Sequence, residues 1–286
     1  MTLVIEKAAR TGFCLGVKRA IDTLERVAAE RGGIETLGAV VHNRQVLQRL
    51  AGHGVRVAGD IDDIQGDSVV VGAHGIGPEA EDRIRPRGVE SINTTCPFVR
   101  RAQKVADRLA RSGFTIVVFG DAGHPEVKGI LGWGGGNGVA TLDPEAVVAA
   151  CGATRRIGLL AQTTQIPDRF ADFAREVIGA VLDKDSEISV IDTICHDIRQ
   201  RQAAAIELAG HVDLMLVTGD RASANTNRLA ELCATATETQ LVETAADVEP
   251  AWLDGIVRVG VTGGASTAEE TIDDVVARLR ELGATS

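Results

Sequence analysis

Apolar residues recur at helical spacing after three of the cysteines, Cys14, Cys96 and Cys195, each of which stands at a predicted turn. The apolar positions are Val17, Ala20, Ile21, Leu24, Val27 and Ala28 after Cys14, Phe98, Ala102, Val105 and Leu109 after Cys96, and Ile198, Ala205, Ile206 and Ala209 after Cys195. A glycine ends each predicted helix, and glycine is the residue that most readily adopts a left-handed cap; the three are Gly32, Gly113 and Gly210. Basic residues follow each cysteine by four or five places, namely Lys18, Arg19, Arg100, Arg101 and Arg199. One structural unit used three times is the simplest explanation of this pattern.

Between the cysteines, short apolar runs alternate with further helical patterns. The runs SVVVGAH, FTIVVFG and VDLMLVTG are apolar almost throughout, which is typical of strands buried on both faces in parallel sheets. Helices are predicted between such runs, for example over 45–51, 167–182 and 226–233. We therefore expect an α/β fold of three pseudo-threefold-related modules with small, mostly parallel sheets, arranged as a cloverleaf. The expected modules are residues 1–95, 96–194 and 195–286.

Polar side chains that could bind a ligand or take part in catalysis lie where the predicted strands end. They are His42, Asn43, His74, His124, Glu126, Thr163, Thr164, Ser223, Asn225, Thr262 and Ser266. Ligands of parallel α/β sheets bind at the carboxyl ends of the strands, where loops and helix N-termini meet. A threefold arrangement predicts that these residues and the three cysteines face one central cavity.

Composition narrows the class of protein and its partners. The chain has 286 residues, 3% aromatic residues, no tyrosine and a net charge of −10, which is a poor basis for nucleic-acid binding. No signal peptide and no apolar run long enough to span a bilayer is visible. The five cysteines are an odd number and widely spaced, so we expect a reducing, cytoplasmic location without disulfides and without a membrane partner.

The repeated cysteines have several possible roles. A closed zinc site normally takes four ligands, often as CxxC pairs, and no CxxC occurs here. Three thiolates suit an iron–sulfur cubane whose fourth iron stays open as a Lewis acid toward substrate. Each cysteine alone would more often be a small buried hydrophobe, and we expect that role for Cys151 and Cys233, which lack the repeated context.

The histidines and small polar residues suggest an anion site. Glycines in GAHGIG and TGGAST let backbone amides approach a phosphate, although neither loop is a nucleotide-binding fingerprint. Glu126 follows His124 by two residues at a predicted helix start, and a carboxylate beside a hydroxyl such as Thr163 would make a proton relay. The alternatives are structural histidines and an acidic residue favoured by the helix dipole.

The motifs GFCLGVKRA, VVHN, AHGIG, TCPFV, GHPEVKG, AQTTQ, SANTNRL and GVTGGAST, taken in order, resemble those of the 4-hydroxy-3-methylbut-2-enyl diphosphate reductases, the IspH/LytB family. The resemblance implies a 4Fe–4S cluster held by Cys14, Cys96 and Cys195 at the centre of the modules. It implies a diphosphate held by His42, His74, His124, Ser223, Asn225 and Ser266, and proton transfer by Glu126 with Thr163 and His124. It also implies reductive dehydroxylation to isopentenyl and dimethylallyl diphosphate in the non-mevalonate pathway, driven by a ferredoxin- or flavodoxin-type donor.

Two motifs differ from the family pattern. His196, Asp197 and Ile198 follow the third cysteine where the family has Tyr-Ala-Thr, and Ala224 stands where the family has a second serine. These differences support an alternative, namely a divergent paralogue that reduces another allylic or alcohol substrate. A non-catalytic iron–sulfur sensor and a thiol-nucleophile enzyme that uses Cys14 or Cys195 are further alternatives.

Overall fold

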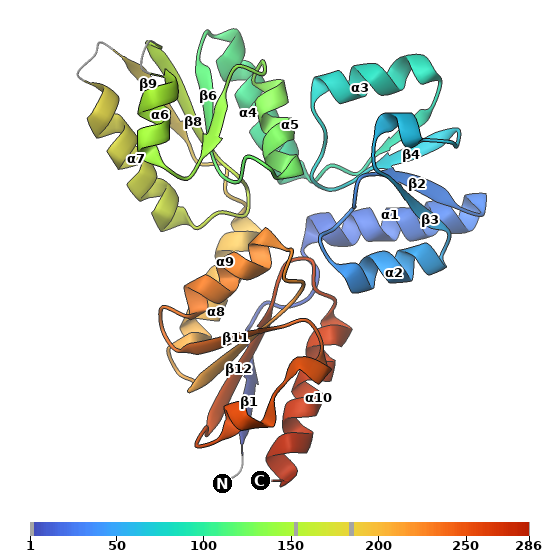
Figure 1. The fold of residues 1–286 in the computed structure, drawn as a ribbon, viewed down its shortest axis with the longest axis vertical. Coiled ribbons are helices and arrows are strands. Elements are labelled where there is room, and N and C mark those ends of the chain that lie inside the picture. Colours follow the sequence, from blue (N-terminus) through green and yellow to red (C-terminus); the bar gives the residue numbers. More distant parts are fainter. Residues whose placement is uncertain (1–2, 152–153, 183–185, 286) are drawn as a thin grey trace. The chain divides into compact units, whose positions relative to one another are not determined.

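The computed structural model describes residues 3–151, 154–182 and 186–285 and folds them into three four-stranded parallel sheets with flanking helices (Figure 1). The first sheet contains β2 (Ile34–Leu37), β3 (Val55–Ala58), β4 (Ser68–Val71) and β5 (Glu90–Asn93). The second contains β6 (Thr115–Phe119), β7 (Val139–Thr141), β8 (Arg156–Ala161) and β9 (Glu187–Ile191). The third contains β10 (Leu214–Thr218), β11 (Glu238–Val242), β12 (Arg258–Gly263) and β1 (Val4–Lys7). The predicted α/β class with three parallel sheets is confirmed.

Ten α-helices connect the described strands. They are α1 (Leu15–Arg31), α2 (Arg44–Gly52), α3 (Pro78–Ile84), α4 (Pro97–Arg111), α5 (Pro125–Trp133), α6 (Pro144–Cys151), α7 (Pro167–Val181), α8 (His196–Ala209), α9 (Ala224–Cys233) and α10 (Glu269–Thr285). None of the helices in the described part of the chain is both long enough and apolar enough to cross a membrane.

The three sheets share one strand order, and the chain closes on itself to complete the third. The orders are β3-β2-β4-β5, β7-β6-β8-β9 and β11-β10-β12-β1, so a cysteine turn follows the fourth strand of each sheet. The N-terminal strand pairs with β12 in parallel register, Val4 beside Arg258. The prediction that module 1–95 includes the N-terminal residues is therefore wrong, since β1 belongs to the third sheet. The physical reason is that β1 covers an edge of β12 that would otherwise be open.

The contacts divide the chain into two compact units. Unit 1 contains Met1–Lys18, Val41–Arg49 and His196–Ser286, and it includes the third sheet. Unit 2 contains Arg19–Val40 and Leu50–Cys195, and it includes the first two sheets.

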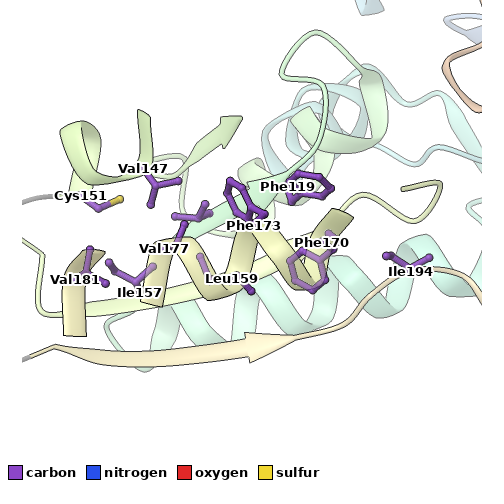
Figure 2. Close-up of a cluster of buried hydrophobic side chains, with 13 residues drawn as sticks. Phe119, Val147, Cys151, Ile157, Leu159, Phe170, Phe173, Val177, Val181 and Ile194 are labelled. Atoms are coloured by element: carbon purple, nitrogen blue, oxygen red, sulfur yellow. The ribbon is translucent and has the colours of Figure 1, made fainter. Parts of the chain in front are cut away.

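The second sheet shows how the apolar runs are used. Side chains on one face of β6 and β8 pack against α6 and α7, and this core includes Phe119, Leu159 and Phe173 (Figure 2). Side chains on the opposite face, such as Val118 and Leu160, pack against α4 and α5. Both faces are covered, which explains why these strands are apolar throughout rather than alternating.

The predicted glycine caps are only partly correct. Gly32 and Gly113 follow α1 and α4 with φ of 73° and 83°, in the left-handed conformation that was expected. Gly210 follows α8 but is absent from the glycines of positive φ, so that prediction was wrong. The chain there turns through a hydrogen bond from the His211 N–H to the Leu208 carbonyl.

Candidate functional site

The three cysteine turns have the same backbone geometry. Each cysteine immediately precedes the first residue of a helix, which is α1, α4 or α8. Each cysteine N–H donates to the carbonyl of the second residue after a central strand: Cys14 to Ala265 after β12 (2.9 Å), Cys96 to Ala73 after β4 (3.0 Å) and Cys195 to Thr163 after β8 (2.9 Å). The sequence repeat therefore corresponds to a repeated structural contact that holds each cysteine at the carboxyl end of a parallel strand.

Backbone amides lie near the sulfur atoms of Cys14 and Cys96. The Val17 N–H donates to the Cys14 sulfur at 3.4 Å. Burial raises the pKa of the Cys96 thiol, the N–H groups of Phe98 and Val99 oppose this rise, and the Glu126 carboxylate adds to it. Amides at a helix N-terminus stabilise negative charge on sulfur, so these positions fit thiolate ligands of an iron–sulfur cluster.

Two arginines from the helices that follow cysteines support other cysteine turns. In unit 2, Arg19 donates to the carbonyls of Thr94 and Thr95, at 3.0 and 2.6 Å, just before Cys96. In unit 1, the buried Arg201 donates to the Gly12 carbonyl at 2.8 Å and to the Asp197 carboxylate at 2.7 Å. The sequence pattern marked Arg19 only as a basic residue after a cysteine and did not mark Arg201, because these contacts join segments far apart in the chain.

Glu126 and Thr163 form a buried acid–hydroxyl pair in unit 2. Glu126 lies in the first turn of α5, only 1% exposed, and its Oε1 accepts the Thr163 N–H at 2.6 Å. The Thr163 hydroxyl donates to Oε2 at 2.9 Å, and the Thr163 carbonyl accepts from Cys195. Thr163 thus connects the Glu126 carboxylate to the Cys195 turn, and in this position the carboxylate can hold or release a proton.

Two predicted histidines lie beside this pair. His124 caps α5, and its Nδ1 accepts the Glu126 N–H at 3.1 Å. The His74 and His124 rings meet edge to face with centroids 5.0 Å apart. His74 lies on a tight turn after β4 that requires Gly75 at φ 68°, where an added Cβ would lie 2.8 Å from the Thr95 methyl group. Unit 2 therefore brings together Cys96, Cys195, His74, His124, Glu126 and Thr163.

Unit 1 gathers the other predicted anion-binding residues. The Asn43 amide donates to the Ser266 carbonyl at 3.0 Å, and the Ser266 hydroxyl donates to the His42 carbonyl at 3.4 Å. Ser223 caps α9 by accepting the Thr226 N–H at 3.3 Å, and Asn225 follows it half-buried. The loops after β2 and β12 are thereby tied to each other.

Asp220 joins the loop after β10 to the loop after β2 and was missed by the sequence reasoning. Its carboxylate accepts the N–H groups of Arg44 at 2.9 Å and Ala222 at 2.8 Å, and it is 6% exposed. Burial would raise the pKa of this carboxyl, but the two amides and the Arg44 guanidinium hold that pKa below its ordinary value. Burial lowers the pKa of His42, and the nearby Asp220 charge opposes the decrease. An acidic residue two places after a strand was the available signal.

The remaining cysteines and the two unusual positions have clear locations. Cys151 and Cys233 are 2% and 0% exposed within apolar cores, and burial raises the pKa of Cys233 to about 12, which confirms the expected structural role. Ile198 is buried in the first turn of α8. Ala224 is the first residue of α9, half-buried and directly after Ser223.

Comparison with known proteins gives consistent matches over nearly the whole chain. The LytB protein family matches residues 5–280. A 4-hydroxy-3-methylbut-2-enyl diphosphate reductase of Dehalococcoides mccartyi is 54% identical over 280 residues, which cover 98% of this chain and 99% of the relative. A protein of the same name from Geobacter metallireducens is 40% identical over 276 residues, 96% of each chain.

Solved structures agree with these matches. A structure of (E)-4-hydroxy-3-methyl-but-2-enyl diphosphate reductase, described as the terminal enzyme of the non-mevalonate pathway, has 36% identity and a TM-score of 0.71, covering 98% of this chain and 100% of that one. A reductase structure from Plasmodium falciparum shares the fold, with a TM-score of 0.88 at 23% identity over 97% of this chain and 88% of that one. The repeated cysteine turns, the family match and the identities over nearly full length all lead to one conclusion: the chain belongs to the LytB family.

Proposed function

We propose that the protein is the reductase that converts (E)-4-hydroxy-3-methylbut-2-enyl diphosphate into isopentenyl and dimethylallyl diphosphate. The observation that carries the proposal is the buried Glu126–Thr163 pair, hydrogen-bonded at both carboxylate oxygens and linked through the Thr163 carbonyl to Cys195. The names of relatives that are 40% to 54% identical over almost their whole length support the same reaction.

Cys14, Cys96 and Cys195 are the proposed ligands of a 4Fe–4S cluster. The repeated turns support this assignment, because each places a cysteine at a helix N-terminus, and backbone amides donate to the sulfur atoms of Cys14 and Cys96. When bound by three thiolates, such a cluster supplies electrons and one open iron as a Lewis acid. A reducing cytoplasm, the predicted location, would keep these thiols available as ligands.

The proposed diphosphate ligands are His42, His74, His124, Ser223, Asn225 and Ser266. Each lies on a loop after a parallel strand or at a helix start, where hydrogen-bond donors and the helix dipole favour anions. Ser223 and His124 are themselves helix caps, so a bound phosphate would meet α9 and α5 at their positive ends.

Glu126 is the proposed source of protons. The overall reaction consumes two electrons and two protons: one proton leaves with the substrate hydroxyl as water, and the other adds to an allylic carbon. The Thr163 hydroxyl can exchange a proton with Oε2 across the 2.9 Å contact, while the Thr163 N–H fixes Oε1. Burial excludes bulk water, so proton delivery depends on this pair.

The test is Glu126→Gln with Glu79→Gln as its matched control. Both glutamates directly follow a proline in the first turn of a helix, but Glu79 is exposed. Glutamine can keep both Thr163 hydrogen bonds, since the hydroxyl can rotate to accept from the amide. We expect turnover of Glu126→Gln to fall about 10²–10⁴-fold in an anaerobic assay with a reduced dye. Iron content should be unchanged, and Glu79→Gln should behave as wild type.

Three results would decide against the proposal. Wild-type protein with a full complement of iron and no turnover of the diphosphate would overturn the reaction and favour a sensor. Faster turnover of another allylic alcohol in a substrate panel would favour a divergent paralogue, with the buried Ile198 as the position to exchange for threonine. Activity without iron that alkylation abolishes would instead favour a thiol nucleophile.

A further inference from the structure

The outer face of α4 carries four basic side chains that take no part in the fold. A shallow groove of about 450 Å³ is lined by Pro97, Arg100, Arg101, Lys104, Val105 and Arg108. The four basic residues are exposed and recur at helical spacing, so they form one stripe. Within the described ranges, no carboxylate lies within ion-pair distance of any of them. We call this stripe the α4 basic face.

Comparable basic residues elsewhere have internal partners. Arg19, five places after Cys14, holds the turn before Cys96, and Arg201, six places after Cys195, holds the turn before Cys14. On α4 itself, Arg111 pairs with Asp107 at 2.9 Å. Positions 100 and 101, four and five places after Cys96, have no such contact in the described structure.

Local energetics do not favour this arrangement. Like charges four residues apart on a helix repel one another, and positive charges in its first turns oppose the helix dipole. The stripe is positive, whereas the chain as a whole has a net charge of −10. An acidic partner would be attracted to this face.

We propose that the α4 basic face is the docking site for a small acidic electron-transfer protein. The inference rests on the proposed function, because it takes Cys96 as a cluster ligand. The groove begins at Pro97, the residue after Cys96, and the Arg100 N–H donates to the Cys96 carbonyl at 2.9 Å. It extends about 17 Å along the helix at 1.5 Å per residue, so a partner seated on its first turns lies next to the proposed cluster. The groove lining contains no aromatic side chain for stacking bases, which disfavours a nucleic acid.

The test compares Arg101→Glu/Lys104→Glu with the charge-matched control Arg85→Glu/Arg175→Glu. The control residues are 77% and 72% exposed and lie away from the face. The probe is a purified bacterial ferredoxin of negative net charge, and binding to the cluster-loaded protein is measured by titration calorimetry at low and moderate salt. We expect affinity to fall roughly tenfold or more in the test variant and little in the control, and wild-type affinity to fall with salt. The milder Arg101→Gln/Lys104→Gln should lie between.

A second measurement separates this proposal from the proposed function. Turnover driven by a small reduced dye needs no docking and should be equal in wild type and in all three variants, whereas the ferredoxin oxidation rate should fall in the test variants. Absence of dye-driven turnover in wild type would count against the proposed function alone. Ferredoxin binding that is unchanged in Arg101→Glu/Lys104→Glu would overturn the docking site. So would tighter binding of a double-stranded DNA 20-mer that the same substitutions abolish.

Discussion

Replacing Asp220 with asparagine should disconnect two loops of the candidate site in unit 1. The two carboxylate oxygens accept different amides, Oδ2 from Arg44 and Oδ1 from Ala222. Asparagine keeps only one acceptor oxygen and turns an NH₂ group toward the second amide. One partly buried N–H donor thus loses its partner, at a cost of about 1 kcal/mol in the free energy of unfolding.

Asp213 provides a matched control. A single oxygen of Asp213, Oδ2, accepts the N–H groups of both Val257 and Arg258, at 3.0 and 2.8 Å, on an exposed part of the same unit. The one oxygen of asparagine can accept from both amides, so Asp213→Asn should cost much less than Asp220→Asn. The comparison separates the loss of an acceptor atom from the loss of a negative charge.

Trp252 allows unit 1 to be followed by itself. It packs on the core of the third sheet, and the chain has only one other tryptophan, Trp133. Urea unfolding of the variants in a Trp133→Phe background, followed by Trp252 fluorescence, reports the free energy of unfolding of this unit. Equal losses for Asp220→Asn and Asp213→Asn would refute the two-oxygen reasoning.

The effect of Asp220 should depend on pH in a defined direction. Its folded pKa lies below the ordinary value, so the carboxylate stabilises the fold above the unfolded pKa. That contribution disappears as the pH falls through the folded pKa, because both states are then protonated. The advantage of wild type over Asp220→Asn should therefore be constant from neutral pH to about pH 5 and shrink below about pH 4. An advantage that grows with acidity would contradict the assigned sign.

Three further experiments test the core and the thiols. Cys96→Ser places a preferred cap residue before α4, so it should raise the unfolding free energy of the cluster-free protein by up to about 1 kcal/mol, and the protein should bind less iron than wild type. Cys233→Ser, at a site with no exposure, should lower the unfolding free energy by about 1–3 kcal/mol and leave iron binding unchanged. Iodoacetamide at pH 8 should leave Cys151 and Cys233 unmodified in the folded protein, as peptide mapping would show, because both are buried and burial raises their pKa. Phe173→Ala should lower the unfolding free energy by about 3–5 kcal/mol, against about 0.5 kcal/mol or less for the exposed Leu182→Ala, by urea unfolding.

The sequence was sufficient for the parts of the fold that depend on local pattern. Parallel strands buried on both faces gave long apolar runs, and α7 spans Pro167–Val181, against the predicted 167–182. The short strands β1 and β3 were not predicted, because their burial is uneven and their pairing partners lie elsewhere in the chain. β1 belongs to a sheet whose other strands lie more than 200 residues away.

The site was predictable where chemistry and strand ends coincide. Glu126 was paired correctly with Thr163, since both follow strands of one sheet and both are polar residues in apolar surroundings. Asp220 was not found, because an aspartate after a strand is an ordinary turn residue in sequence. Only the fold shows that it accepts the amide of Arg44.

The hydrogen bonds that stabilise the cysteine turns explain why the sequence repeat is visible at the cysteines but not in the residues around them. All three turns use a backbone N–H, which any residue supplies, so this contact leaves no signature. Two places before the cysteine, Thr94 and Thr193 each donate a hydroxyl to the carbonyl at the end of a central strand. The equivalent Gly12 has no hydroxyl; it takes φ 71°, and its carbonyl accepts from Arg201 instead. One backbone geometry is thus stabilised by two different chemistries, and only the cysteine, the proposed cluster ligand, is the same in all three turns.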